Sequence, residues 1–341
     1  MAVFLTSREV GLLLGVRDYI EILEQAYDQL GKGKSSMLPR IKLDASQRTG
    51  FLKILPAVLS GAGVAGIHAY TGGGRGDFLK VILLYDIESG NLEAIIEADR
   101  IGWLAAGAAS AVATKYLAGK DARIMAVFGS GKQAKSQLLA ISCVRDLELV
   151  KVYSPLKEHR DAYCEEMGKR LNLSVVPALS PEEAVEGAHI IAAATNTRTP
   201  VFNGKLINPG VHINAIGAHD PGRREVDETC IMRSKVIVDS RERALQEEGA
   251  LLIPMGEGLI GPTHVYGELG EIVAGKKAGR INNEEITLFL SGAVSVEYVA
   301  IGAEVYRRAR EKGLGQHLSL TRDEDVPKSL YIKKRTNPTC P

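Results

Sequence analysis

The hydrophobic positions of the first 117 residues predict two helices followed by a set of strands. Apolar side chains recur at helical spacing over residues 16–30, and a shorter helix is expected around Val10, capped by Ser7. Extended apolar segments follow at 40–43, 50–55, 66–70, 80–85 and 92–97. The turn before the last segment predicts an antiparallel sheet with hairpin connections. A helix of small residues, 105–117, suits close packing against another backbone.

From Ala122 onward, apolar strands alternate with amphipathic helices. Strands are expected at 123–128, 149–153, 173–176, 189–193, 212–216 and 235–238. Helices are expected between the first of these strands, at 132–143, 158–171 and 181–186. Repeated β-α-β units with continuous apolar strands are typical of a doubly wound parallel sheet, so the fold class is α/β with a Rossmann-type domain.

The C-terminal part changes pattern again. Residues 283–312 indicate one long helix or two, too far from the last predicted strand to form another crossover. We expect this segment to pack back on the N-terminal sheet, which would make the first domain discontinuous. The predicted boundaries are 118–289 for the parallel domain, and 1–117 together with 290–341 for an α+β domain.

One loop carries a strong chemical signal. It fits G-x-G-x-x-A directly after a predicted strand and at the opening of a predicted helix, and its residues are Gly129, Ser130, Gly131, Lys132, Gln133 and Ala134. Gly129 allows the tight turn, Gly131 lets a diphosphate approach the backbone, and Ala134 keeps helix and strand close. The loop predicts dinucleotide binding; a glycine-rich turn without a ligand is the alternative.

The residues at the end of the second parallel strand should determine whether the protein binds NAD(H) or NADP(H). NAD enzymes usually place an acid there to hold the ribose hydroxyls, but this strand runs into Ser154 and then Lys157 without one. Ser154, Lys157 and Arg160 could accept a 2′-phosphate, which favours NADP(H) over NAD(H). Glu158 at the helix start keeps NAD(H) open.

Composition narrows the class of protein. The 341 residues include 42 Lys+Arg and 41 Asp+Glu, which gives a formal net charge of +1. A net charge this small creates no general electrostatic attraction to nucleic acid or to an anionic membrane. No apolar run approaches the roughly 20 residues that span a bilayer, and no secretory leader is expected. The cysteines are scattered without a Cys-x-x-Cys pair, at Cys143, Cys164, Cys230 and Cys340. We therefore expect reduced thiols in a cytoplasmic protein, and no metal site.

Five stretches, in this order and spacing, resemble the ornithine cyclodeaminase/mu-crystallin family over nearly the whole chain. They are residues 108–117, 129–134, 213–218, 224–227 and 267–272. The resemblance implies a Rossmann domain inserted into a substrate-binding and dimerisation domain, with the active site in the cleft between them. It also implies a homodimer that handles small α-amino acids or cyclic and open imines.

Further residues take roles from the resemblance. Arg40 matches the arginine that grips the substrate carboxylate, a task suited to its bidentate fork. Two loops at the carboxyl ends of predicted strands match loops that touch the cofactor, and their residues are Thr195, Asn196, Ala215, Ile216 and Gly217. That position also predicts a ligand crevice independently of the resemblance.

Several positions depart from the family pattern. The active-site lysine falls on His68, and an arginine that helps bind the carboxylate falls on Ala105. A usual aspartate falls on His219, with Asp220 displaced by one position, and another aspartate falls on Tyr298. As an imidazolium, His68 could be a general acid; the alternative is a sheet histidine without chemistry.

Two loops bear on these departures. The usual Ser-Val-Gly stretch near the C-terminus reads Ser291-Gly292-Ala293. Arg75, in a glycine-rich loop, is a candidate to replace the missing positive charge.

Three functions follow as hypotheses. The first is an NAD(P)-dependent oxidoreductase acting on the C–N bond of a small amino or imino acid, with Arg40 holding the carboxylate and His68 delivering a proton. The second is an amino-acid cyclodeaminase, in which His219 or Asp220 would act on a distal amine. The third is a non-catalytic NAD(P)H-binding protein of the mu-crystallin type.

Overall fold

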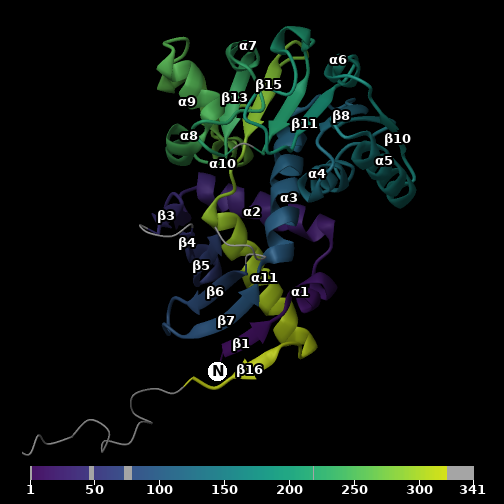
Figure 1. Cartoon of the computed structure of the whole chain (residues 1–341). Coiled ribbons are helices and arrows are strands. Elements are labelled where there is room, and N and C mark those ends of the chain that lie inside the picture. The colour runs from purple at the N-terminus through teal and green to yellow at the C-terminus, as the bar shows by residue number, and fades with distance from the viewer. Residues whose placement is uncertain (1, 46–49, 73–78, 218, 321–341) are drawn as a thin grey trace, which may run out of the picture.

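The computed structural model describes residues 2–45, 50–72, 79–217 and 219–320. Arg75 and Cys340 lie outside these ranges. The described residues form two eight-stranded sheets with helices, one above the other in Figure 1. Helix α3 (Asp99–Leu117) runs from the lower layer to the upper one.

The lower sheet is built almost entirely of antiparallel pairs, as predicted. Its order is β16-β1-β7-β6-β5-β4-β2, with β3 also paired to β4. The strands are β1 (Ala2–Leu5), β2 (Ser35–Met37), β3 (Ile41–Asp44), β4 (Phe51–Leu59), β5 (Val64–Gly72), β6 (Lys80–Asp86), β7 (Leu92–Glu97) and β16 (Gln316–Leu318). Strands β1 and β7 form the one parallel pair of this sheet. Strand β1 was not expected, because four residues are too few to show an alternating pattern.

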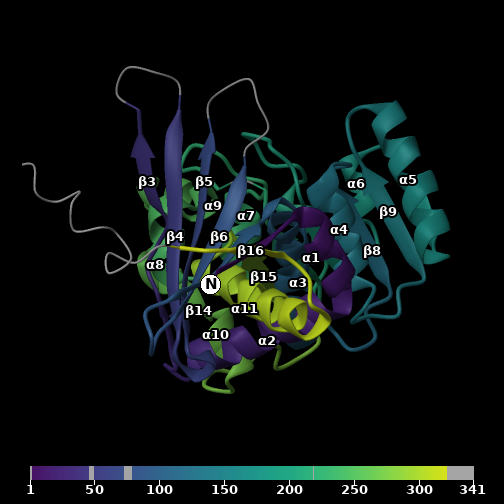
Figure 2. The same cartoon turned by 90° about the horizontal axis from the view of Figure 1, so that it is seen from below.

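Helices cover one face of the lower sheet. Helix α11 (Ser295–Lys312) packs along β4, β5 and β6, as Figure 2 shows from below, and α2 (Val16–Gly31) packs beside it. The short helix α1 (Ser7–Leu13) is capped by Thr6 rather than by the predicted Ser7. The Thr6 hydroxyl oxygen accepts a hydrogen bond from the Glu9 amide, and the Glu9 carboxylate accepts one from the Thr6 amide. This reciprocal pair is a capping box.

The upper sheet is wholly parallel, in the order β10-β9-β8-β11-β12-β15-β13-β14. Its strands are β8 (Ile124–Phe128), β9 (Leu149–Tyr153), β10 (Ser174–Pro177), β11 (Ile190–Ala193), β12 (His212–Ala215), β13 (Ser234–Val238), β14 (Val265–Glu268) and β15 (Ile286–Leu290). Its helices are α4 (Lys132–Ile141), α5 (Lys157–Leu171), α6 (Pro181–Val185), α7 (Glu228–Arg233), α8 (Arg241–Glu247), α9 (Gly249–Gly256) and α10 (Leu269–Val273). All six predicted strands are present within two residues of their expected ends.

The prediction of helix over 283–312 is wrong in its first part. Residues Ile286–Leu290 form β15, a fully buried strand between β12 and β13, and α11 begins only at Ser295. A five-residue apolar run has the same hydrophobic pattern in a buried strand and in a buried helix, so periodicity could not separate them. The prediction that the following helix packs on the lower sheet is confirmed.

The two layers meet where backbones touch. Helix α10 crosses α2 so closely that a Cβ on Gly31 would lie 2.0 Å from the Gly270 carbonyl oxygen. Helix α3 approaches α4 in the same way, with a Cβ on Gly107 only 2.4 Å from the Ser136 carbonyl oxygen. Glycine is therefore required at both contacts, which fix how the two sheets face each other.

Candidate active site

The G-x-G-x-x-A loop has the geometry of a diphosphate cradle. Gly129 has φ +110°, and a Cβ there would lie 2.6 Å from the Ala194 carbonyl oxygen, so the turn needs glycine. Gly131 is the N-cap of α4, no side chain caps this helix end, and a Cβ on Gly131 would meet nothing within 4 Å. The first amides of a helix lack intrahelical acceptors and carry positive partial charge, so this open end fits a diphosphate.

A buried carboxylate joins the two loops that follow β11 and β12. Glu225 accepts from the Thr195 amide (2.6 Å), the Thr195 hydroxyl (2.7 Å) and the Gly217 amide (2.6 Å). Burial raises the pKa of Glu225, although these hydrogen bonds oppose the shift. Glu225 lies in one of the family stretches, but no role was predicted for it. It brings Thr195 and Gly217 together beside the Gly129 turn.

The end of β9 is polar and without a carboxylate, as predicted. The Ser154 hydroxyl is buried and lies 3.0 Å from that of Ser130 in the cradle. Arg160 is also buried and donates to the Ser154 carbonyl oxygen, while its Nε has no partner among the described residues. Lys157 is exposed and paired with Asp161 on the outer side of α5.

Arg40 lies just before β3, below the upper sheet. Its side chain is only 6% exposed, its Nη2 donates to the Gly292 carbonyl oxygen, and it lies 3.7 Å from a Glu247 carboxylate oxygen. Its Nε is buried without a partner. The guanidinium is therefore anchored and still has a donor for a ligand.

A buried ionic cluster supports this anchor from the upper layer. Arg243 donates from Nε to Asp239 (2.7 Å) and from Nη1 to Glu248 (3.3 Å). The other Asp239 oxygen accepts from the Gly292 amide at 2.7 Å. Gly292 thus binds Asp239 through its amide and Arg40 through its carbonyl. The next residue, Ala293, has φ +65°, a left-handed conformation that is unusual for alanine.

His68 is a buried ring without polar partners. It is 1% exposed, and both ring nitrogens lack a hydrogen bond to the described residues. The ring stacks on Tyr298 with centroids 3.8 Å apart, so two departures from the family pattern touch each other. Burial, together with the charges of Lys80 and Arg40, lowers the pKa of His68 to about 3. The ring is therefore neutral at pH 7 and carries one N–H.

His219 and Asp220 lie on the upper side of the same region. Burial and the charges of Arg243, Arg40 and Lys53 hold the pKa of His219 well below its usual range, and its Nδ1 is buried without a partner. Asp220 is exposed and accepts from the Gly222 amide at 3.0 Å. The structure thus gathers His68 and His219 around Arg40, with Asp220 at the edge.

Sequence reasoning missed two lysines in this region. Strand pairing sets Lys53 of β4 opposite Tyr70 of β5, and Tyr70 opposite Lys80 of β6. His68 is two residues from Tyr70, so all four side chains lie on one face of the sheet. Alternation along β4 and β6 could have indicated this face, but only the pairing register shows that the lysines flank the histidine.

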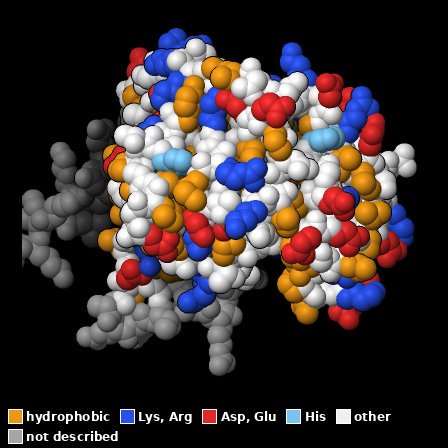
Figure 3. All heavy atoms as spheres, turned by 90° about the horizontal axis from the view of Figure 1, so that it is seen from above, with side chains coloured by type: hydrophobic (Ala, Val, Ile, Leu, Met, Phe, Trp, Pro, Cys, Tyr) orange, Lys and Arg blue, Asp and Glu red, His pale blue; other side chains and the backbone are white. Residues whose placement is uncertain are grey.

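Among the described residues, no three His, Cys, Asp or Glu side chains are placed to hold a metal ion. Within the same residues, no helix has the length and apolar character needed to cross a membrane. On the face seen in Figure 3, basic and acidic side chains lie side by side.

The family profile of the ornithine cyclodeaminase/mu-crystallin family matches residues 1–313. The chain belongs to this family. The predicted family is therefore confirmed.

Individual relatives show the same likeness. The chain is 32% identical over 321 residues to a Delta(1)-pyrroline-2-carboxylate reductase of Bacillus cereus, covering 92% of this chain and 98% of that one. The solved structure of Thermococcus litoralis Delta(1)-pyrroline-2-carboxylate reductase with NADH and L-proline has TM-score 0.88 and 36% identity, covering 93% and 100% of the two chains. An archaeal alanine dehydrogenase dimer with bound NAD has TM-score 0.88 and 29% identity, covering 94% and 99%. The predicted α/β fold class is confirmed.

Proposed function

We propose that this protein is an NAD(P)H-dependent reductase of small 2-imino acids, of the pyrroline-2-carboxylate type. The observation that carries the proposal is a pair of buried groups without partners among the described residues, the Arg40 Nε and the His68 ring, in a chain whose upper layer carries an open helix start suited to a diphosphate. A buried polar group without a partner is costly, so such a pair indicates a polar ligand. The named activities of the relatives support an imine or amino acid as that ligand.

Arg40 and the buried cluster behind it orient the substrate. Held by Gly292 and Glu247, the guanidinium would bind the substrate carboxylate and present one face of the C=N bond to the cradle side. When bound, the reduced nicotinamide supplies a hydride to the imine carbon. Imine, hydride and one proton together give the amine, and the oxidised cofactor leaves.

His68 would position the substrate rather than protonate it. Its pKa of about 3 leaves a neutral ring, which is a poor proton source, in place of the predicted imidazolium acid. The single N–H can hydrogen bond to the substrate, and the proton that completes the amine comes from solvent. The stacked Tyr298 ring holds the imidazole in place.

For the cofactor, the structures of relatives contain NADH or NAD. We propose that this chain accepts NADP(H) at least as well. Support comes from the absence of a carboxylate between Ser154 and Lys157 and from the buried Arg160 beside Ser154. Dissociation constants for NADPH and NADH, measured by calorimetry, test this preference.

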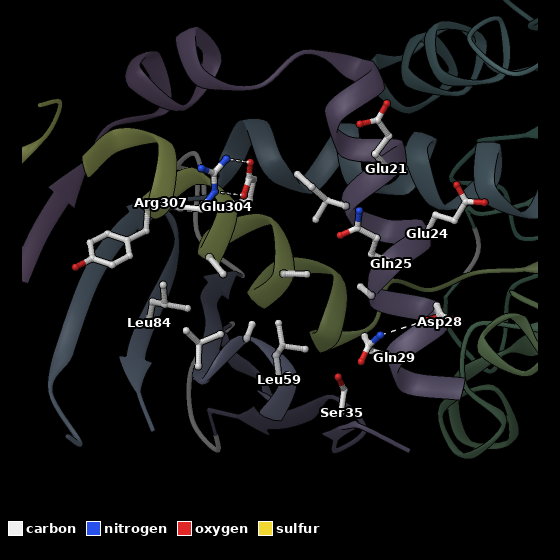
Figure 4. A pocket seen from close by; sticks show the side chains of 18 of the residues that line it. Glu21, Glu24, Gln25, Asp28, Gln29, Ser35, Leu59, Leu84, Glu304 and Arg307 are labelled. Carbon is white, nitrogen blue, oxygen red and sulfur yellow. Dashed lines mark hydrogen bonds and ion pairs between the residues drawn. The ribbon is translucent and has the colours of Figure 1, made fainter. Parts of the chain in front are cut away.

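We also propose a homodimer through the lower domain, residues 1–117 and 290–341, while 118–289 bind the cofactor. A groove of about 1360 Å³ lies between α2, α11 and the inner face of β4 and β5, with apolar and charged walls. In Figure 4, Glu21, Glu24 and Asp28 line one side, and Arg307 bonded to Glu304 lies across from them. Its mixed charges suit a second copy of the chain; the alanine dehydrogenase relative is a dimer. Light scattering of the purified chain tests this. The cytoplasmic location stays a prediction.

The test of function is oxidation of NADPH and NADH with Δ1-pyrroline-2-carboxylate, and with pyruvate plus ammonia or methylamine. We expect turnover with at least one of these. Release of ammonia from ornithine without net nucleotide oxidation would instead show a cyclodeaminase. Tight nucleotide binding with no turnover on any substrate would show a non-catalytic binding protein and overturn the proposal.

A further inference from the structure

A row of polar side chains crosses three adjacent strands of the lower sheet, next to His68 and on the same face. The register places Lys53, Tyr70 and Lys80 on three adjacent strands at one level, and Leu55, His68 and Ile82 at the next level. Side chains on a strand alternate between faces, so both rows lie on the side that α11 covers. Two ammonium groups therefore lie beside the buried imidazole.

These two cations are without a fixed counter-ion. Neither Lys53 nor Lys80 has an acidic oxygen within 4.0 Å of its Nζ among the described residues. Both are partly buried. Their nearest recorded partners are aromatic faces, with Lys53 Nζ 5.0 Å from the Phe51 ring centroid and Lys80 Nζ 5.7 Å from that of Tyr70. A partly desolvated ammonium in this setting favours an anionic ligand.

Lys53 and Lys80 differ in what faces them. The negative charges of Glu247 and Asp220 act on Lys53, together with the positive charge of Arg40. Lys80 instead lies against helix α3, where a Cβ built on Gly102 would be 3.7 Å from its Nζ. Lys53 therefore has acidic charge nearby, whereas the contact recorded for the Lys80 ammonium is with the Gly102 position of α3.

The position of the Lys80 ammonium is relevant to the departure from the family pattern at Ala105. Ala105, fully buried, stands where the resemblance implies a carboxylate-binding arginine. Helical side chains lean toward the N-terminus and cover the preceding turn, so a long side chain at 105 would extend over Gly102. Gly102 has no side chain to fill that space. The Lys80 ammonium therefore lies where the charged end of such an arginine would be expected.

We propose that Lys80 is a substrate-binding residue, which together with Arg40 holds the carboxylate of a 2-imino or 2-amino acid and replaces the positive charge lost at Ala105. The proposal rests on the function proposed above and deepens it. Lys80 lies one level from His68 on the same face of the sheet, and the charges of Lys80 and Arg40 both act on the His68 ring. The single His68 N–H and the Arg40 Nε, which have no partner among the described residues, supply the remaining donors.

The first experiment compares Lys80→Met with Lys169→Met, which removes a surface lysine paired with Glu165. The probes are pyrrole-2-carboxylate, a planar anion, titrated by calorimetry into the NADH-saturated protein, and Δ1-pyrroline-2-carboxylate in steady-state assays. Loss of a charge-assisted hydrogen bond should raise Kd and KM of the Lys80→Met protein about tenfold to a hundredfold. Reduction of 1-pyrroline, which lacks the carboxylate, should change less than twofold, and Lys169→Met should match the wild type.

The second experiment moves the charge back to the helix. Adding Ala105→Arg to Lys80→Met should recover at least part of the lost affinity for pyrrole-2-carboxylate, while Lys80→Arg alone should keep most of it. If Lys80→Met does not fold, as judged by its NADH affinity, Lys80→Gln replaces it as the neutral variant.

The outcomes separate the two proposals. Unchanged Kd and KM in the neutral Lys80 variant would overturn the assignment of Lys80 while leaving the reductase in place. An equal loss with 1-pyrroline would also overturn it, because the role would then not concern the carboxylate. If the wild-type protein neither binds pyrrole-2-carboxylate nor reduces any imine, the proposed function itself fails.

Discussion

The two sheets keep the family pattern to very different degrees. In the parallel sheet, Gly129 and Gly131 form an open turn at the start of α4 that matches the G-x-G-x-x-A motif residue by residue, with the Glu225 contacts beside it. In the antiparallel sheet and the helices around it, His68 and Tyr298 replace charged residues and stack on each other. The difference teaches that a diphosphate is recognised mainly by backbone, which tolerates little change, whereas a substrate is recognised by side chains that can exchange roles.

The largest expected effect is on the substrate side. Arg40→Met should lower kcat/KM by about thirtyfold or more, because truncating a buried hydrogen-bonded charge costs about 2–5 kcal/mol. NADH affinity should stay within twofold, which fluorescence titration can measure. Arg123→Met, which removes an exposed arginine paired with Glu148 on the surface, is the matched control. A parallel loss of nucleotide affinity would show that Arg40 supports the fold rather than the substrate.

The two glycines of the cradle should respond differently. Gly131→Val should weaken NADH binding at least tenfold without lowering the melting temperature, since its Cβ meets nothing in the protein. Gly129→Ala should lower the melting temperature, because its Cβ would clash with the Ala194 carbonyl and its φ is positive. Calorimetry measures the change in NADH affinity, and thermal unfolding measures the change in melting temperature. A lower melting temperature in both variants would show that Gly131 has a structural role despite the open space around its Cβ position.

His68 should affect turnover less than Arg40 does. His68→Ala should lower kcat about tenfold, the size of one lost hydrogen bond to the substrate. Because its pKa is about 3, the activity should show no loss attributable to His68 between pH 8 and pH 5. A pH–rate profile in which His68→Phe removes an inflection near pH 6.5 would contradict the neutral ring.

The same buried ring should influence stability in acid. Between about pH 6.5 and pH 3 the unfolded chain binds a proton at this position and the folded chain does not, so stability falls as the pH falls. His212, with a pKa of about 3, adds to the slope from the other sheet. His68→Phe should make the decline in urea midpoint from pH 6.5 to pH 4 shallower. An unchanged slope would show that His68 is exposed to protonation in solution.

The smallest effect concerns Ala293. Its φ of +65° costs a non-glycine residue about 1–2 kcal/mol, and glycine returns roughly 0.5–1 kcal/mol of that as backbone entropy. Ala293→Gly should therefore stabilise the protein by about 1 kcal/mol or less, measured by urea unfolding. Ala300→Gly within α11 should destabilise it by about 1 kcal/mol. Destabilisation by both would show that the alanine methyl is needed where it packs.

Features that depend on one short segment of the chain could be predicted from the sequence, whereas features that depend on residues distant in sequence could not. The cradle and the six parallel strands were predictable, because a strand, a tight turn and a helix lie within one short segment. β15 was not, because five apolar residues suit either kind of buried element. The relation of Lys80 to Ala105 was also out of reach, since it depends on strand register and on the approach of α3 to the sheet. The role of Glu225 depends on two loops that are distant in sequence.

The contact between Gly31 and Gly270 has a consequence for engineering this scaffold. Because main-chain atoms meet directly there, no side-chain truncation or enlargement can adjust the separation of the two layers at that point. Even one added methyl group on Gly31 would act as a wedge and tilt the whole upper half. The spacing of the two layers at this junction is therefore a property of two polypeptide backbones, and redesign of the proposed substrate site for bulkier compounds has to change other residues while leaving this junction untouched.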